Sequence, residues 1–284
     1  MKPNEKITVA FFGTPHFAQI VLEKLLDSPY KPKLTITAPD AKSGRGNKLK
    51  ETPVKQTAVK NNIKVFTPTN LKTESGPEVF DLAILVAYGK IIPRAVLEIP
   101  KYGFINIHPS VLPKYRGPTP VQNTILNGDE KTGVSIMLLD EQIDHGPVLT
   151  QTEMKIADDD THQSLSEKLF TQGAETLLEI IPDFLAGKLT PKEQNHQEAT
   201  FTSHIEKQDG YIKIDNPPKK EQFQKMVKAY FPWPNVWTKI DGKVIKFLPG
   251  DKIQPEGKLP MSAKEFKNGY PQLFSKLPAS LLSE

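Results

Sequence analysis

The chain of 284 residues contains no cysteine. This absence excludes disulfide bonds, zinc sites built on thiolates and a cysteine nucleophile. It also fits a reducing compartment, where disulfides are rare. The remaining composition is ordinary for a globular protein, with 37% hydrophobic and 25% charged residues. The length allows one large domain, or one domain with a smaller second one.

Long apolar runs are also missing. No stretch approaches the ~20 apolar residues that a membrane-spanning helix needs, and the opening residues MKPNEK lack the apolar core of a signal peptide. We therefore expect a soluble, cytoplasmic protein. The formal net charge of +4 is a mild basic bias, which permits an anionic partner without proving one.

Two common nucleotide-binding fingerprints are absent. The first apolar run ends at Gly13-Thr14-Pro15, and no GxGxxG follows it. The chain also has no GxxxxGK[ST] phosphate loop. The sequence therefore argues against nicotinamide dinucleotide chemistry and against nucleoside triphosphate chemistry.

Apolar runs alternate with amphipathic stretches through the first part of the chain. The patterns predict strands over 7–12, 34–38, 63–66, 82–87, 104–107, 132–139 and 148–156. Helices are expected at 16–26, 53–61 and 119–127, and a further helix after residue 160 is expected to kink or break at Pro182. This alternation predicts an α/β fold, a mostly parallel sheet with helices on both faces. Such sheets bind ligands at the carboxyl ends of their strands.

The stretch 101–122 supplies the first candidate site. Asn106 and His108 alternate at the end of a short strand, so their side chains share one face. An irregular loop rich in proline follows and holds Lys114 and Arg116. A titratable group that leaves a strand into such a loop is a plausible catalytic arrangement, although a surface histidine beside a turn fits this segment alone equally well.

A second segment supports the catalytic interpretation. Asp144 follows the predicted strand 132–139 and precedes Gly146-Pro147, a rigid turn that would fix its direction. A carboxylate brought to the strand end at His108 would orient and tune the imidazole. The alternative is a solvated cluster of acidic residues.

A basic loop lies between the second strand and the second helix, with the sequence DAKSGRGNKLK over residues 40–50. Two glycines flank Arg45, with Lys42 and Lys48 nearby. A solvated flexible loop is one interpretation. The other is an arginine that grips phosphate, which its place at the ligand-binding edge of the sheet favours.

The last part of the chain is expected to be a smaller unit. Residues 187–204 lose apolar periodicity and are predicted to form a linker. A helix is expected at 221–230, followed by a hairpin in which Asp241-Gly242 joins strands 236–240 and 243–248. Beyond Pro249 the sequence is rich in lysine and proline, so we expect few regular elements there.

These segments resemble the methionyl-tRNA formyltransferases. The matching pieces are FFGTPHFA, GRGNKL, LVAYGKIIP, INIHPSVLPKYRGPTPVQ and TGVSIMLLDEQIDHGPVL, in the expected order. The resemblance implies a Rossmann-like catalytic domain at 1–188, a linker at 189–206 and a C-terminal, β-rich, barrel-like domain at 207–284 that helps to hold tRNA. Little strand-like sequence follows Leu248, so part of that barrel is expected to be missing or rebuilt.

The resemblance also implies the chemistry. The formyl donor would be 10-formyltetrahydrofolate, the acceptor would be initiator methionyl-tRNA, and no metal would be needed. Asn106, His108 and Asp144 would be catalytic. The folate would lie along Tyr88, Gly89, Ile91, Ser110, Val111, Leu112 and Pro113. The tRNA would contact Lys42, Arg45, Lys48, Lys114 and Arg116. We expect a monomer with no protein partner.

Other functions keep some of these features. A formyltransferase acting on an amino sugar linked to a nucleotide would keep Asn106, His108 and Asp144 but would have no use for the Arg45 loop. A hydrolase of formyl-folate is a second alternative. A third is an RNA-binding protein that has lost catalysis, against which the intact trio argues.

Overall fold

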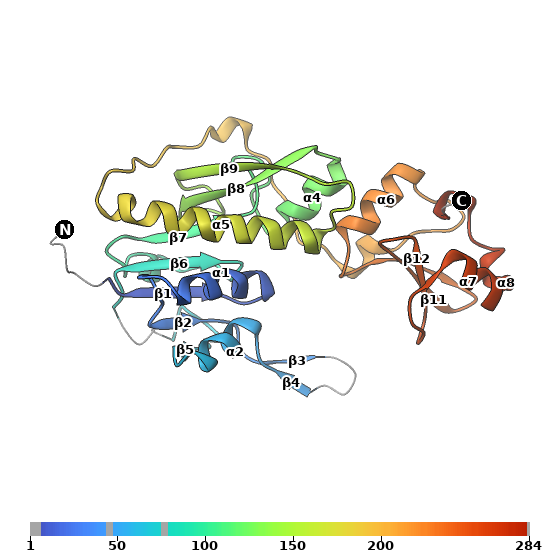
Figure 1. The fold of residues 1–284 in the computed structure, drawn as a ribbon, viewed down its shortest axis with the longest axis horizontal. Coiled ribbons are helices and arrows are strands. Elements are labelled where there is room, and N and C mark those ends of the chain that lie inside the picture. Colours follow the sequence, from blue (N-terminus) through green and yellow to red (C-terminus); the bar gives the residue numbers. More distant parts are fainter. Residues whose placement is uncertain (1–6, 44–47, 75–78, 283–284) are drawn as a thin grey trace. The chain divides into compact units, whose positions relative to one another are not determined.

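The computed structural model describes residues 7–43, 48–74 and 79–282 (Figure 1). It contains two compact units. The first comprises Met1–Pro118, Thr132–Met154 and Ser166–Phe201, and the second comprises Thr119–Lys131, Lys155–Leu165 and Thr202–Glu284. The domain limits expected from the sequence, at residues 188 and 206, stay a prediction.

The first unit is built on a seven-stranded sheet with the order β5-β2-β1-β6-β7-β8-β9. The strands are β1 (Val9–Gly13), β2 (Leu34–Ile36), β5 (Lys64–Phe66), β6 (Leu82–Val86), β7 (Phe104–His108), β8 (Lys131–Leu138) and β9 (Val148–Lys155). Pairing is parallel from β5 through β7 and antiparallel between β7 and β8. The predicted mostly parallel sheet is confirmed.

The strands form where the sequence is continuously apolar because both faces of this sheet are covered. All five residues of β1 and all five of β7 are buried. Phe12 packs against Phe104 with ring centroids 5.0 Å apart and against Tyr88 at 5.6 Å. These aromatic contacts join β1, β7 and the segment after β6 into one core.

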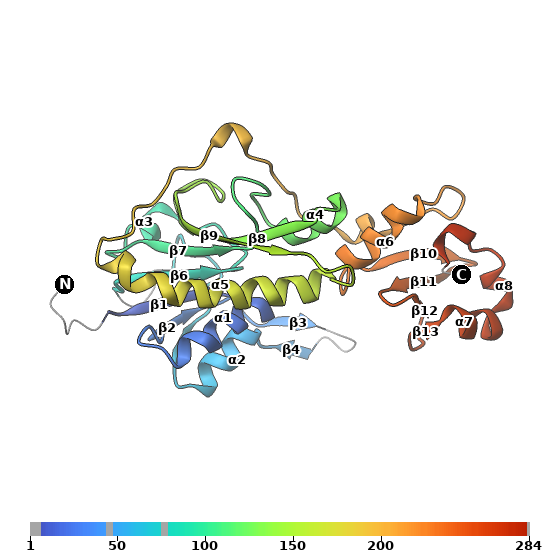
Figure 2. The same ribbon diagram turned by 45° about the horizontal axis from the view of Figure 1, so that its top comes forward.

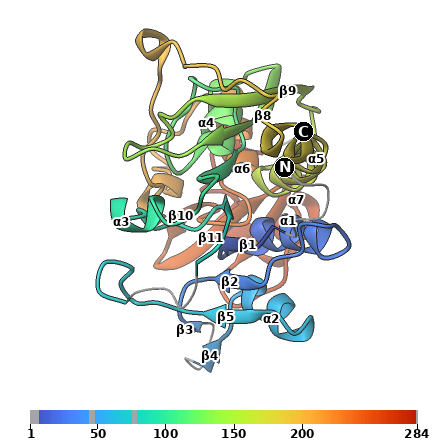
Figure 3. The same ribbon diagram turned by 90° about the vertical axis from the view of Figure 1, so that its left-hand side faces the viewer.

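Helices lie on both sides of this sheet. Figure 3 shows α1 (His16–Leu26), α2 (Pro53–Lys60) and α5 (His162–Leu185) on one side and α3 (Arg94–Leu97) on the other. α1 has the predicted bounds. α2 begins where Thr52 accepts a hydrogen bond from the Lys55 amide and Pro53 occupies the first turn, a common N-terminal arrangement.

The sequence predicts a kink or a break in α5 at Pro182. The helix does not break there, because it continues to Leu185, and the kink stays a prediction. Proline removes one helical hydrogen bond and costs about 3 kcal/mol inside a helix. The penalty is tolerated here because the residue lies in the last turn and the apolar side of α5 is buried on both sides of it, at Ile181 and Leu185.

The strand order reverses between β1 and β6. Chain order moves outward from β1 through β2 to β5, and then returns to start again at β6. Doubly wound sheets bind ligands beside such a switch point, at the carboxyl ends of the strands. Gly13, Ala87 and His108 therefore mark the edge where a site is expected.

The second unit contains a four-stranded antiparallel sheet, β10 (Val236–Ile240), β11 (Lys243–Leu248), β12 (Lys252–Pro255) and β13 (Met261–Ser262), in that order (Figure 2). The hairpin of β10 and β11 has the predicted bounds. Asp241 and Gly242 both have positive φ angles, 51° and 79°, as a type I′ turn requires. Helices α4 (Pro120–Asn127) and α6 (Lys220–Ala229) contact each other in this unit.

The expectation of few regular elements beyond Pro249 is wrong. Besides β12 and β13, this segment forms α7 (Ala263–Gly269), α8 (Pro271–Phe274) and a short 3-10 helix, η3 (Ala279–Leu281). Ser262 and Glu265 form a reciprocal capping box at the start of α7. That S-x-x-E spacing is visible in the sequence and indicates the start of a helix. Among the described residues, no helix combines the length and hydropathy needed to cross a bilayer.

Candidate active site

The carboxyl end of β7 carries Asn106 and His108. Both side chains are buried, with 5% and 4% of their surface exposed. Parallel pairing with β6 on one side and antiparallel pairing with β8 on the other fixes this strand, with His108 opposite Ser135. The two polar side chains therefore project from the most constrained part of the sheet, as alternation along the strand predicts.

Asp144 lies beside them. Its carboxylate accepts a hydrogen bond from the Gly117 amide at 2.7 Å, and it lies 3.4 Å from Asn106 Nδ2 and 3.6 Å from His108 Nδ1. The Asp144 side chain is 14% exposed. Three residues from two distant parts of the chain thus meet around one point, as the sequence predicts.

The contacts of His108 indicate where its ring carries hydrogen. Nε2 lies 2.9 Å from the Tyr115 carbonyl oxygen, which can only accept. Nε2 is therefore the donor in this contact, which leaves Nδ1 as the nitrogen that faces Asp144. The residue after His108 begins an irregular loop, and the loop's own backbone orients the ring.

The loop that follows β7 is held by hydrogen bonds to side chains of β8 and β9. Ser135 Oγ donates to the Ser110 carbonyl at 2.6 Å and accepts from the Leu112 amide at 3.0 Å. Gln151 Nε2 donates to the Leu112 carbonyl at 2.8 Å, and the Leu112–Pro113 peptide bond is cis. The loop consequently has a defined shape although it has no regular secondary structure.

The residues predicted to bind folate lie at two neighbouring strand ends. After β6, the ring of Tyr88 is buried, and burial raises the pKa of its hydroxyl to about 12, while Ile91 is 78% exposed. After β7, Ser110 and Leu112 are buried, and Ser110 Oγ donates to the Lys114 carbonyl. The exposed Gly89 and Ile91 and the half-buried Val111 and Pro113 are the parts of this set open to a ligand.

The two basic residues of this loop, Lys114 and Arg116, differ in solvent exposure. Lys114 is exposed, as a contact to phosphate requires. Arg116 is only 3% exposed, and its Nε and terminal nitrogen donate to Gln194 Oε1 at 3.1 and 2.7 Å. Burial lowers the pKa of Arg116, while nearby Asp144 and Asp140 act in the opposite direction. The guanidinium of Arg116 is thus used inside the protein, and its predicted contact with tRNA stays a prediction.

The two ends of the basic loop after β2 are short strands that pair with each other as a hairpin. β3 (Ala41–Ser43) pairs antiparallel with β4 (Lys48–Lys50), apart from the main sheet. The backbones of Lys42 and Lys48 belong to these two strands. Arg45 lies outside the described residues. The contact of this loop with tRNA stays a prediction.

Gln194 is the main residue that sequence reasoning missed. It lies in the stretch expected to be a linker, yet it is only 7% exposed. Its Nε2 donates to the carbonyl oxygens of Asp144 and Gly146. A glutamine in a segment without apolar periodicity gives no sign of this role. Ser135 was detectable, as an isolated polar residue in a continuously apolar strand.

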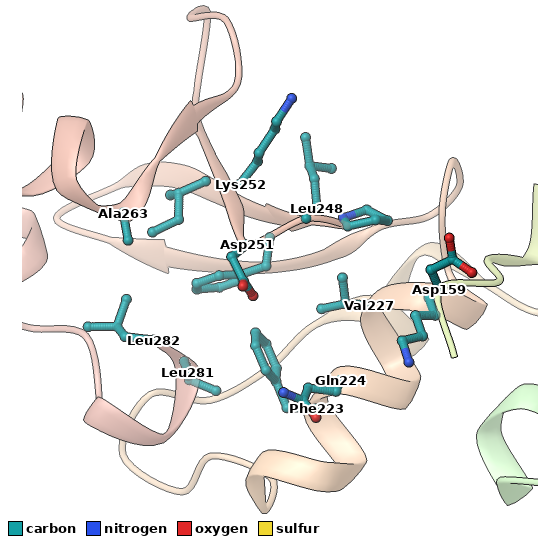
Figure 4. Close-up of a pocket in the computed structure, with 15 residues that line it drawn as sticks. Asp159, Phe223, Gln224, Val227, Leu248, Asp251, Lys252, Ala263, Leu281 and Leu282 are labelled. Atoms are coloured by element: carbon teal, nitrogen blue, oxygen red, sulfur yellow. The ribbon is translucent and has the colours of Figure 1, made fainter. Parts of the chain in front are cut away.

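The second unit holds a cavity of about 320 Å³ (Figure 4). Its lining mixes apolar side chains such as Phe223 and Leu281 with the charged Asp251 and Lys252. None of the predicted site residues lines it. The predicted catalytic residues lie instead at the strand ends of the first unit. Among the described residues, no group of three or more His, Asp or Glu side chains could hold a metal ion.

Comparison with known proteins gives the class. The sequence model of the formyl transferase family matches residues 5–181. Among solved structures, an N-formyltransferase from Helicobacter canadensis, in complex with folinic acid and dTDP-3-aminofucose, superposes with a TM-score of 0.65 at 20% identity and covers 89% of this chain and 96% of its own. At that identity the likeness shows the shared fold.

Closer relatives narrow the class. A methionyl-tRNA formyltransferase of Roseiflexus sp. (strain RS-1) is 40% identical over 248 residues, which are 85% of this chain and 76% of the relative. The methionyl-tRNA formyltransferase of Roseiflexus castenholzii is 36% identical over 93% of this chain and 96% of its own length. The chain belongs to the formyl transferase family and, within it, to the methionyl-tRNA formyltransferases.

Proposed function

We propose that the protein transfers the formyl group of 10-formyltetrahydrofolate to the α-amino group of methionine on initiator methionyl-tRNA. The observation that carries the proposal is the convergence of Asn106, His108 and Asp144 at the end of β7, in a chain that matches methionyl-tRNA formyltransferases over most of its length. Folate as the donor is supported by the folinic acid bound in the Helicobacter canadensis structure.

In this reaction the amine nitrogen attacks the formyl carbon, and the bond from that carbon to N10 of the folate breaks. The amine loses a proton and N10 gains one, so no oxidant or reductant is needed. A tetrahedral intermediate with a negatively charged oxygen lies between the two states. Catalysis therefore requires hydrogen-bond donors for that oxygen and a group that moves the proton.

Asn106 suits the first task. Its Nδ2 carries two hydrogens, and the contact with Asp144 at 3.4 Å uses one of them. The other is available to the oxyanion. Because the amide is buried and held by a β-strand, it needs no reorganisation as the charge develops, which is the condition under which such a donor is most effective.

His108 and Asp144 suit the second task. Because Nε2 is engaged with the Tyr115 carbonyl, Nδ1 is the nitrogen able to accept a proton from the attacking amine. The carboxylate of Asp144, 3.6 Å away, would stabilise the positive charge on the ring. It is fixed in turn by the Gly117 amide. The proton can then pass to N10 as the folate leaves.

The folate ring would lie beside the loop 110–113 and the segment after β6, and the phosphates of the tRNA would be contacted by the basic loop 42–48 and by Lys114. Val111, Pro113 and Ile91 supply partly or fully exposed apolar surface there, which suits a planar ring. The absence of a protein partner stays a prediction.

An acceptor screen tests the proposal. The protein and 10-formyltetrahydrofolate would be incubated with initiator methionyl-tRNA, elongator methionyl-tRNA or dTDP-linked amino sugars, and the formylated product quantified. We expect product with initiator methionyl-tRNA, and none with initiator methionyl-tRNA whose amine is acetylated. Transfer to an amino sugar with none to tRNA would overturn the proposal in favour of sugar formylation.

A further inference from the structure

Gln194 lies near the site, and none of its hydrogen bonds among the described residues is to the side chain of Asn106, His108 or Asp144. Its carboxamide forms four hydrogen bonds. Oε1 accepts from Arg116 Nε at 3.1 Å and from the Arg116 terminal nitrogen at 2.7 Å. Nε2 donates to the Asp144 carbonyl at 2.9 Å and to the Gly146 carbonyl at 2.7 Å. Two acceptor and two donor positions of the amide are therefore used.

The chemistry of the partners fixes the orientation of this amide. A guanidinium can only donate and a backbone carbonyl can only accept. Rotating the amide by 180° would place donor against donor at Arg116 and acceptor against acceptor at Asp144. Only a side chain with an acceptor on one side and a donor on the other fits between these groups, and among the charge-free side chains of this length glutamine has both.

The segment held by Gln194 is not in a relaxed conformation. Asp144 has φ +47°, in the left-handed region that residues with a Cβ avoid. A Cβ at Gly146 would clash with the carbonyl oxygen of Leu138, so the turn passes directly against the end of β8. A conformation of this kind persists only where surrounding contacts over-determine it. Gln194 supplies two of those contacts, one on each side of residue 145.

We propose that Gln194 is a positioning residue for formyl transfer, which keeps the Asp144 carboxylate between Asn106, His108 and the Gly117 amide. Arg116 is the second link, because it holds Gln194 in place. The inference rests on the proposed function, since it assigns the effect to Asp144. The stretch 189–206 thus contributes to the active site and does more than connect the two units.

The first test replaces one atom. Gln194→Glu keeps the size and the contact with Arg116 but removes both donors to the turn. We expect kcat to fall about 100-fold, because small misplacement of a catalytic group costs that much, while KM for both substrates changes little. Gln197→Glu is the matched control: the same change in an exposed residue of the same segment, expected to leave kcat unchanged.

A double-mutant cycle separates positioning from general destabilisation. If Gln194 acts through the carboxylate of Asp144, Gln194→Glu costs much less rate in an Asp144→Asn background than in the wild type. A merely structural role predicts equal losses in both backgrounds, and that result would overturn the proposal. Thermal unfolding of each variant is measured alongside. Should the Glu variant not fold, Gln194→Met is used, and failure of both to fold would establish a structural role only.

A readout without substrate distinguishes this inference from the proposed function. The NMR chemical shifts of the His108 ring nitrogens, recorded at one pH, report the hydrogen bonding and the nearby carboxylate of the ring. We expect Gln194→Met, which removes both donors to the turn without adding a charge, to change these shifts, and Gln197→Met to leave them unchanged. If the wild type forms no formyl product but the His108 shifts respond to Gln194→Met, the proposed function fails while the positioning role stands. Unchanged shifts contradict the positioning role.

Discussion

Two strand ends of the same sheet are built in opposite ways. The end of β7 is followed by a loop whose backbone is hydrogen-bonded to Ser135 and Gln151. The buried side chain of Arg116, in the same loop, is hydrogen-bonded to Gln194. The end of β2 leads into the β3–β4 hairpin, which does not belong to the main sheet. In this hairpin 71% of the surface of Leu49 is exposed.

The difference follows from what each strand end would do. Formyl transfer needs hydrogen-bond donors held about 2.7–3.1 Å from the oxygen on which negative charge develops. A loop whose conformation is fixed by hydrogen bonds favours such precise placement. Contact with a tRNA backbone depends mainly on charge and tolerates movement. The base of the hairpin is held by the Asp40–Lys55 ion pair and by the hydrogen bond between Thr37 and Thr52.

The largest effect is expected at the β7 end. His108→Ala should lower kcat about 100- to 1000-fold, because it removes the group proposed to accept the proton from the amine. The measurement is single-turnover formyl transfer, with circular dichroism to show that the fold is retained. A folded variant with near-normal turnover would remove His108 from the mechanism.

The next effect is expected in the hairpin loop. Arg45→Ala should raise KM for methionyl-tRNA roughly tenfold or more, the loss of one charge-assisted contact, and leave folate affinity unchanged. Lys31→Ala removes an exposed positive charge elsewhere in the same unit and serves as the control. An equal loss of folate affinity would show that Arg45 belongs to the folate site, and the contrast between the strand ends would fail.

A third change examines the end of β6. The Tyr88 hydroxyl has no hydrogen-bond partner among the described residues, so Tyr88→Phe should raise the free energy of unfolding by about 1 kcal/mol. Its folded pKa of about 12 lies above the unfolded value near 10. Ionisation of this tyrosine therefore leaves the free energy of unfolding unchanged below pH 10 and lowers it as the pH rises toward 12, because the unfolded state loses the proton first.

Alkaline unfolding curves of wild type and Tyr88→Phe check this expectation. The variant should lose less stability between pH 10 and pH 12. A fall in folate affinity would instead show that the hydroxyl contacts the folate. The segment after β6 would then bind folate through a side chain as well as through its backbone.

The smallest effect is expected at the base of the hairpin. The ion pair between Asp40 and Lys55 joins side chains that are 31% and 22% exposed, with 2.7 Å between the charged atoms. Partly exposed pairs contribute about 0.2 to 1 kcal/mol, so Asp40→Asn should lower the free energy of unfolding by no more than that. A double-mutant cycle with Lys55→Met measures the coupling, and a coupling above that range would mean that the hairpin is anchored as tightly as the β7 loop.

Much of this comparison could be predicted from the sequence. Alternation at the end of 104–107 placed Asn106 and His108 on one face, and the Gly146-Pro147 turn indicated that Asp144 would be fixed. The strands of the seven-stranded sheet were predicted within two residues of their actual ends. The central ones, such as β1 and β7, are continuously apolar because both of their faces are buried.

What could not be predicted depends on contacts between distant segments. Arg116 looks like a surface arginine in the sequence, and its burial depends on Gln194, 78 residues away. Gln194 lies in a segment whose pairing is made by isolated bridges, such as Val148 with Lys192 and Arg116 with Phe201, which leave no periodic pattern. A local signal does exist at Ser262 and Glu265, where the S-x-x-E spacing of the capping box indicates the start of α7.

We propose above all that the Asp144 carboxylate accelerates formyl transfer by stabilising the positive charge on the His108 ring. The most direct measurement is the single-turnover rate of formyl transfer to initiator methionyl-tRNA by Asp144→Asn, which keeps the shape of the side chain and removes its charge. The account predicts a fall of about 100-fold or more with folate affinity unchanged. A rate within twofold of the wild type would contradict it.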